Sequence, residues 1–326
     1  MRKTLLLLAA AALVAVSGAA FAADPVSLNA GHTASTAHHY QKSLEEFAKL
    51  VTERTDGAVK INIFPASQLG SLPEMTESTM LGTQDMVLTA GPILGNEIVE
   101  FQALYMPYIF EGYDHINRFD GSEAAVILGE KLEEKGAVLL GWWENGFRII
   151  TNSKRPIVKP GDMEGMKIRV GKSQMAIDTF EILGVNPTPI AISELYTAMQ
   201  LGTVDGQENP TGRALSGKYY EVQDYLSVTH HQHVFEPLIM NKAKFDSLPE
   251  NVQKVLLEAA AEVALQDRKA VADQEAGELK QLEELGMKVN EVDLPAFQEA
   301  MQPLYDKYAE ERGDDWRELV DMIRNL

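Results

Sequence analysis

Apolar and polar residues alternate in two short segments near the start of the chain. These segments, Val26–Ala30 and Val59–Ile63, have the period of two that is typical of β-strands, and Asp85–Thr89 is a third strand-like segment. Two segments with helical spacing lie between them; the first places Tyr40, Leu44, Phe47 and Val51 on one face, and the second runs from Glu74 to Leu81. The order strand, helix, strand, helix, strand predicts an α/β domain with a mostly parallel sheet.

A second set of strands and helices follows in the middle of the chain. The pattern predicts strands at Ala137–Gly141, Phe147–Thr151, Lys167–Val170 and Pro187–Ile190, and a helix from Gln174 to Leu183. Ser193 has the residue type of an N-cap for a further helix that ends at Gln200. We expect two α/β halves joined by more than one crossing strand.

A helical pattern without a break runs from Pro249 to Leu285. This is a long helix for a globular protein. A coiled coil is one interpretation, but the apolar stripe is rich in alanine and favours a helix packed across its own protein.

The first residues have the features of a cleaved secretory signal. Met1-Arg2-Lys3 is basic, Leu5–Val16 is apolar, and small residues stand at Ala20 and Ala22. The apolar run of about 12 residues is shorter than the roughly 20 that span a bilayer. We therefore expect residues 1–22 to be removed on export to the periplasm.

Charge and cysteine content exclude several classes of function. The formal net charge is −19, and removal of Arg2 and Lys3 with the signal leaves −21. A surface this acidic repels nucleic acid and anionic membranes. The absence of cysteine excludes disulfides, thiolate metal sites and a cysteine nucleophile. Any site for an anionic ligand must then be locally positive, so buried arginines become informative.

Motifs of catalysis, nucleotide binding and metal binding are incomplete. Gly171-Lys172-Ser173 resembles the end of a phosphate-binding loop, but five residues separate it from Gly165 where that loop needs four. The cluster His230, His231 and His233 has no HExxH helix or cysteine beside it. Nothing in the order of Ser, His and Asp singles out a catalytic triad. We expect no cofactor and no metal; whether the histidine cluster contacts a ligand stays open.

Two arginines stand in strand-like segments. Arg169 lies in Lys167-Ile168-Arg169-Val170, and Arg148 lies in Asn145-Gly146-Phe147-Arg148. Each arginine either pairs with one of the 48 acidic residues or clamps a ligand carboxylate with its two parallel donors.

The chain resembles the solute-binding subunits of the TRAP (tripartite ATP-independent periplasmic) transporters, in their DctP-type branch. The resemblance rests on the following segments: Gln68-Leu69-Gly70, Asn145-Gly146-Phe147-Arg148, Gly161-Asp162-Met163-Glu164-Gly165-Met166-Lys167-Ile168-Arg169-Val170, Ser193-Glu194-Leu195-Tyr196 and Gly202-Thr203-Val204-Asp205-Gly206-Gln207-Glu208-Asn209-Pro210. It covers essentially the whole mature chain.

This resemblance implies an α/β, two-lobed periplasmic binding protein with a long helix bracing both lobes. We assign lobe 1 to residues 23–145, lobe 2 to 146–240, and the long helix with the C-terminal helices to 241–326. The ligand-binding residues that the resemblance implies are Arg169 as the main carboxylate contact, Arg148 as a second positive contact, Asn209 as a pocket amide, and Glu74, with Glu77 as its alternative. His32, in the loop after the first strand, is a further candidate.

The expected function is capture of an organic acid, either a C4-dicarboxylate or a sugar acid such as a uronate, and its delivery to the TRAP membrane permease. We expect a monomer that is not an enzyme. The alternatives are a periplasmic enzyme acting on a carboxylate substrate and an ABC-type binding protein.

Overall fold

The computed structural model describes residues 25–326, and the expected signal, residues 1–22, lies outside the described residues. The N-terminal part has the predicted alternation of strands and helices: β1 (Val26–Gly31), α1 (His39–Arg54), β2 (Val59–Phe64), α2 (Leu72–Leu81) and β3 (Met86–Leu88). β1 pairs in parallel with both β2 and β3. These three strands, with parts of β4 and β9, form the sheet of the first lobe.

The strand β4 (Ala137–Asn152) runs through both lobes. It pairs antiparallel with β9 (His233–Asn241) as far as Phe147, and with β7 (Gly206–Pro210) from Arg148 onward. The sequence predicted two separate strands here, and this prediction was wrong. Two register shifts interrupt the alternation, one of them between Glu144 and Gly146. Gly146 has a φ of 99°, a backbone conformation that favours glycine.

The second lobe contains the remaining strands, β5 (Lys167–Val170), β6 (Asn186–Pro189), β8 (Tyr225–Val228) and β10 (Lys288–Glu291). β5 pairs in parallel with β6 and β7, and β8 pairs antiparallel with β4. The lobes thus share one path of hydrogen-bonded strands. The boundary expected between residues 145 and 146 falls inside β4.

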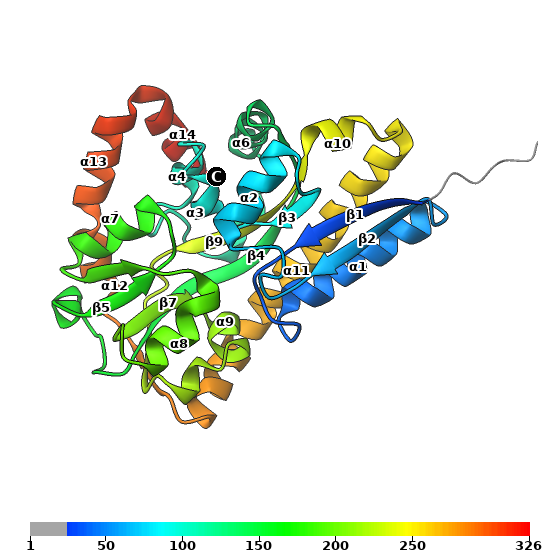
Figure 1. Ribbon diagram of the computed structural model, residues 1–326. Helices are drawn as coiled ribbons and strands as arrows, with labels where there is room; N and C mark the ends of the chain where they lie inside the picture. The colour runs from blue at the N-terminus through cyan, green and yellow to red at the C-terminus, as the bar shows by residue number, and fades with distance from the viewer. Residues whose placement is uncertain (1–24) are drawn as a thin grey trace, which may run out of the picture.

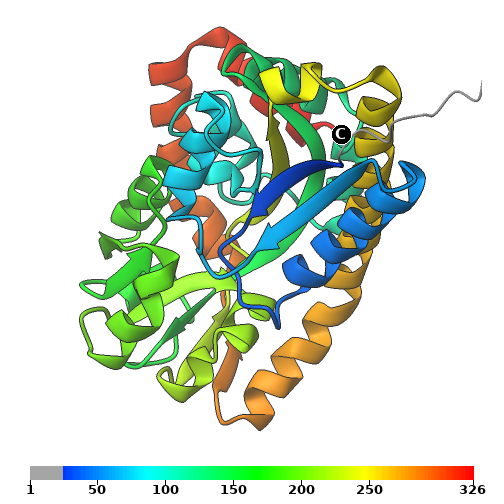
Figure 2. The same ribbon diagram turned by 45° about the vertical axis from the view of Figure 1, so that its right-hand side comes forward.

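The predicted long helix is confirmed as α11 (Glu250–Glu284), which has 35 residues. It packs against α1 and β4 and, further along, against α9 (Thr211–Ser216) of the second lobe. Figure 2 shows it running down the right-hand side of the molecule past both lobes. It is therefore the element that braces them.

The C-terminal helices return to both lobes, as Figure 1 shows. They are α12 (Leu294–Ala300), α13 (Gln302–Arg312) and α14 (Asp314–Arg324). α13 packs against α7 (Gln174–Ile182) of the second lobe, and α14 packs against α4 and α6 of the first.

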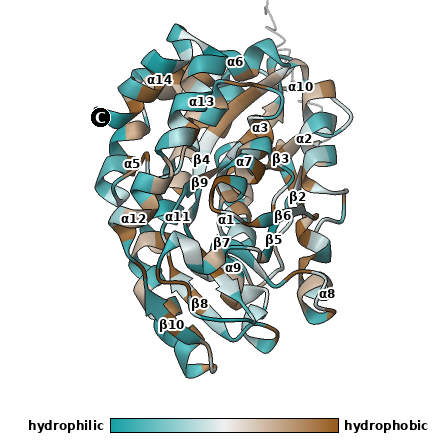
Figure 3. Ribbon diagram, turned by 90° about the vertical axis from the view of Figure 1, so that its left-hand side faces the viewer, coloured by the Kyte–Doolittle hydropathy of each residue, from teal (hydrophilic) through white to brown (hydrophobic). Residues whose placement is uncertain are grey.

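The remaining helices are α3 (Gly91–Leu94), α4 (Phe101–Leu104), α5 (Tyr113–Phe119), α6 (Glu123–Glu134), α8 (Leu195–Gln200) and α10 (Lys242–Asp246). The sequence suggested that Ser193 caps α8, and this prediction was wrong. Ser193 lies in a short 3-10 helix, Ile192–Glu194, that leads into α8. In Figure 3, apolar residues follow β4 and β9 through the interior, and the helices turn polar surfaces outward. Trp142, Phe119 and Phe235 belong to the largest apolar cluster. The shared strands are thus anchored by burial of large side chains.

Candidate functional site at the junction of the lobes

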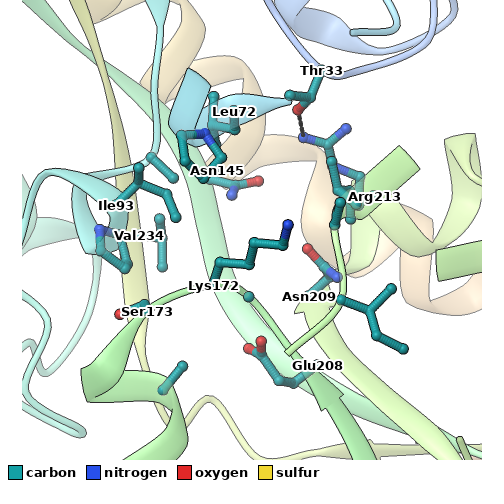
Figure 4. Close-up of a pocket in the computed structure, with 18 of the residues that line it drawn as sticks. Thr33, Leu72, Ile93, Asn145, Lys172, Ser173, Glu208, Asn209, Arg213 and Val234 are labelled. Carbon is teal, nitrogen blue, oxygen red and sulfur yellow. Dashed lines mark hydrogen bonds between the residues drawn. The ribbon is translucent and has the colours of Figure 1, made fainter. Parts of the chain in front are cut away.

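A cavity lies where the two lobes meet. First-lobe residues in its wall include Thr33, Leu72 and Ile93, and second-lobe residues include Lys172 and Asn209. Figure 4 shows these side chains around one common space. Its volume is about 770 Å³, the open mouth included. This size is typical of sites for small molecules.

A larger groove, between α1, α9 and α11, is a weaker candidate. Its volume is about 1540 Å³, open solvent included. Among the described residues, its wall carries two lysines, Lys42 and Lys218, and no arginine. In contrast, the wall of the first cavity carries the cations Arg148, Arg169, Lys172 and Arg213 and two carboxylates. The cavity between the lobes is therefore the better candidate site for an anionic ligand.

Arg169 lies on β5, and its side chain is buried in the cavity wall. Its Nε donates a hydrogen bond to the backbone oxygen of Ile190 at 2.9 Å, which fixes the direction of the guanidinium. Among residues 25–326, Arg169 forms no ion pair. Burial lowers its pKa to about 10, so it remains charged at neutral pH. A buried charge without a partner is costly, and a ligand carboxylate removes that cost.

Arg148 is also buried in the wall, but it has a partner. Its Nε donates to the carboxylate of Glu208, and its Nη2 donates to the Glu208 backbone oxygen at 2.7 Å. Burial alone would raise the pKa of Glu208, but the Arg148 charge holds it at about 2. Nη2 of Arg148 also donates to Oδ1 of Asn209 at 3.2 Å, and Nδ2 of Asn209 donates to Gln207 at 2.6 Å. Arg148 and Asn209 thus line the cavity as members of one hydrogen-bonded network.

The structure places Glu74 and His32 outside the cavity wall. Glu74 is exposed and caps α2, since its Oε2 accepts a hydrogen bond from the backbone N–H of Ser71 at 2.8 Å. His32 is fully buried, and its Nε2 lies 2.9 Å from Oε1 of Gln41. Burial lowers the pKa of His32 to about 4, so its ring is neutral. The neighbouring residues Ser71 and Thr33 line the cavity instead.

Two residues that the sequence did not single out stand in the wall. Arg213, on α9, lies over the ring of Tyr40 with its guanidinium carbon 5.3 Å from the ring centre. Glu236, on β9, accepts a hydrogen bond from Nδ2 of Asn145 at 2.8 Å. Glu236 interrupts the apolar segment Val234–Met240, and an acid inside such a strand was a signal that sequence reading could have used. The sequence around Arg213 offers no comparable signal.

The three clustered histidines lie beside separate carboxylates. Nε2 of His230 lies 2.6 Å from Glu275, that of His231 lies 3.6 Å from Glu208, and that of His233 lies 2.6 Å from Glu144. In residues 25–326, no group of three or more acidic or histidine side chains is placed to hold a metal ion. No helix in this part of the chain is long and apolar enough to cross a membrane.

Comparison with known families gives one match over most of the chain. The model of bacterial extracellular solute-binding proteins, family 7 (DctP), matches residues 30–312. The 2,3-diketo-L-gulonate-binding periplasmic protein of Escherichia coli K12 is 33% identical over 318 residues, which cover 96% of this chain and 96% of that protein.

Solved structures with the same architecture include TRAP periplasmic solute-binding proteins. One from Polaromonas sp. JS666, bound to D-erythronate, has a TM-score of 0.88 and 38% identity, covering 92% of this chain and 99% of that one. Another, from Sulfitobacter sp. NAS-14.1 with bound β-D-galacturonate, has a TM-score of 0.88 and 33% identity, covering 92% and 100%. These matches extend over both lobes.

Proposed function

This chain belongs to bacterial extracellular solute-binding protein family 7, and we propose that its cavity holds one organic acid through a salt bridge between the ligand carboxylate and Arg169. The protein is a periplasmic receptor that captures the acid for a TRAP membrane permease. Its fold suits this role because a ligand bound between two lobes stabilises the closed arrangement by its differential affinity for it.

The observation that carries the proposal is the unpaired guanidinium of Arg169. Arg148 and Arg169 line the same cavity, but of these two only Arg148 forms an ion pair with Glu208. A planar guanidinium on a strand presents parallel donors that match the two oxygens of a carboxylate. With a chain charge of −19, attraction at long range does not explain anion binding, so affinity must come from such short-range contacts.

Arg148, Asn209, Glu74 and His32 have different places in this proposal. Arg148 and Asn209 line the cavity, which supports their roles as a second positive contact and a pocket amide. Glu74 and His32 stand outside the wall, so a direct contact requires them to approach the ligand during closure.

We further propose that the protein releases the acid unchanged and works as a monomer. The relatives described above are named as binding proteins, which supports binding without turnover. Two of these relatives are named as TRAP periplasmic solute-binding proteins, which favours a TRAP permease over an ABC-type transporter as the partner. The enzyme alternative differs in outcome, because a substrate would be consumed.

A ligand screen tests the proposal. Purified mature protein is melted in the presence of dicarboxylates, uronates and aldonates, and each acid that raises the melting temperature is then incubated with the protein and followed by mass spectrometry. We expect at least one acid to stabilise the protein and to be recovered unchanged. Conversion of that acid to a product would support the hypothesis of a periplasmic enzyme. If no acid raised the melting temperature, the proposed receptor function would be contradicted. Light scattering after size exclusion reports the oligomeric state.

A further inference from the structure

The charged groups in the cavity wall leave one buried guanidinium unopposed. Glu208 is paired with Arg148, so these two charges cancel. Lys172 is exposed to solvent, where its charge is screened. Arg213 and Arg169 remain, and of these two only Arg169 forms neither an ion pair nor a cation–π contact among the described residues. The wall therefore offers one strong position for a carboxylate.

Arg213 is a weaker position for a second carboxylate, although its buried Nε has no hydrogen-bond partner among the described residues. Its guanidinium already lies over the ring of Tyr40, and its Nη2 donates to Oγ1 of Thr33 at 3.4 Å, as the dashed line in Figure 4 shows. Glu236 lies in the same wall and carries the opposite charge when its carboxyl group is ionised, as at pH 8. A carboxylate placed near Arg213 would therefore also meet Glu236.

Glu236 and Asn145 form a buried pair on the adjacent strands β9 and β4. Nδ2 of Asn145 donates to Oε1 of Glu236 at 2.8 Å, and both side chains are about 95% buried, with exposures of 5% and 3%. Oδ1 of Asn145 has no hydrogen-bond partner in the part of the chain that the structure describes. Glu236 forms no ion pair with any residue between 25 and 326. The register shift between Glu144 and Gly146 places Asn145 rather than Glu144 in the cavity wall.

The atom of this pair that has no partner among the described residues is an acceptor, Oδ1 of Asn145. Burial raises the pKa of Glu236, and the Tyr40 hydroxyl already acts on its carboxylate and lowers that pKa against the effect of burial. An amide oxygen and an ionised carboxylate accept hydrogen bonds and donate none. A buried acceptor without a donor is costly, so the pair favours a ligand that brings hydroxyl groups. A second ligand carboxylate brings only acceptors and a like charge, which the pair disfavours.

We propose that Glu236 and Asn145 form a hydroxyl-recognition subsite in the cavity of Arg169, which selects a monocarboxylate with several hydroxyl groups, of the aldonate or uronate class, over a dicarboxylate. This inference rests on the proposed function, since it assumes that Arg169 holds the ligand carboxylate. It assigns selectivity to two residues other than the arginine that supplies the anchor.

Matched pairs of acids test the subsite. Erythronate and succinate share four carbons, and gluconate and adipate share six; in each pair the aldonate carries hydroxyl groups on its inner carbons and a terminal alcohol in place of the second carboxylate. Calorimetric titration at pH 8 gives the ratio of dissociation constants within each pair. We expect the wild-type protein to bind at least one aldonate more than 10-fold tighter than its dicarboxylate. The near-isosteric Glu236→Gln removes the charge and should reduce that ratio by about 10-fold, equivalent to about 1.4 kcal/mol.

Two further variants control the interpretation. Asn145→Ser changes the member of the pair that lies on β4. It should weaken binding of the aldonate about 5-fold and leave the affinity for the dicarboxylate within 2-fold of the parent. Glu278→Gln changes a largely buried acid on α11 that stands outside the cavity and accepts a hydrogen bond from Thr211. It should change the affinities of all acids equally. Thermal melts confirm that each variant is folded.

The outcomes separate this inference from the function it rests on. If no acid of either kind binds the wild-type protein, the receptor function fails and the subsite with it. If acids bind but the wild-type protein prefers dicarboxylates, the ligand bridges Arg169 and Arg213 and the subsite is wrong. A ratio that is unchanged in a folded Glu236→Gln protein likewise overturns the subsite alone.

Discussion

Arg148 and Glu208 are bound to each other twice, once through the Glu208 carboxylate and once through its backbone oxygen at 2.7 Å. Both are buried, so removal of the arginine alone leaves an uncompensated buried charge. We expect Arg148→Met to lower the free energy of unfolding by about 3 to 5 kcal/mol. The double variant with Glu208→Gln should recover part of this loss. Urea unfolding of both single variants and the double variant forms a double-mutant cycle; simple additivity would contradict the coupling.

Arg169 has no such internal partner, so its replacement should act on binding rather than on folding. We expect Arg169→Ala to weaken binding of the organic acid by about 2 to 5 kcal/mol, roughly 30-fold to several thousand-fold. Arg169→Lys keeps the charge and loses the two parallel donors, so it should fall between the parent and Arg169→Ala. Calorimetry measures all three proteins. If a folded Arg169→Ala protein bound the acid with parental affinity, the proposed salt bridge between Arg169 and the ligand carboxylate would be contradicted.

Glu236 should make stability depend on pH. Burial raises its pKa from 4.5 to about 7, although the positive charge of Arg213 acts against the shift. A carboxyl group with a raised pKa contributes fully to stability below pH 4.5 and loses that contribution as pH rises through 7. We therefore expect Glu236→Gln to be more stable than the parent at pH 8, on the order of 2 to 3 kcal/mol, and equally stable at pH 4.5.

Chemical unfolding at the two pH values measures the difference. Besides Arg213, the groups whose charges act on Glu236 are Arg148 and His39, so each variant is compared with its parent at the same pH. Glu77→Gln, on the exposed face of α2, is the control and should change little at either pH. An equal gain at pH 4.5 and pH 8 would show that the Glu236 charge is not the cause.

Glu74 and Asn209 should differ in what they control. Glu74 caps α2 and is exposed, so Glu74→Ala should cost about 0.5 to 1 kcal/mol of stability and leave affinity close to parental. Asn209 lines the cavity, so Asn209→Ala should cost about 1 to 3 kcal/mol of binding free energy through lost and stranded hydrogen bonds. Paired melts and titrations measure both quantities. A large loss of affinity in Glu74→Ala would show that closure brings this side chain to the ligand.

Much of the fold could be predicted because its elements follow simple periodicities. The strand Lys167–Val170 and the long helix after Pro249 were found almost to the residue. The division of β4 failed for a physical reason. Glu144 and Asn145 are polar and buried in the middle of the strand, where each is paired with a side chain of β9, His233 and Glu236 respectively. Sequence patterns treat such residues as a break.

The candidate site was harder to predict because it is assembled from both lobes. Arg169 and Asn209 could be found through the family resemblance, and both stand in the cavity wall. Arg213 and Glu236 could not be found in this way, because they approach each other only after α9 and β9 have packed. Nor could the sequence separate Arg148 from Arg169, since the pairing of Arg148 with Glu208 depends on their positions across β4 and β7.

The course of β4 limits how this protein can be recombined with its relatives. A chimera joined at residue 145 would take the two halves of one strand from different parents, and each half would have to fit a partner strand selected with the other parent. Because β4 belongs to both lobes, neither lobe can be exchanged as a separate unit. Because Asn145 and Glu236 lie on β4 and β9, ligand preference should pass to a relative only when β4, β9 and α11 are transferred together from one parent.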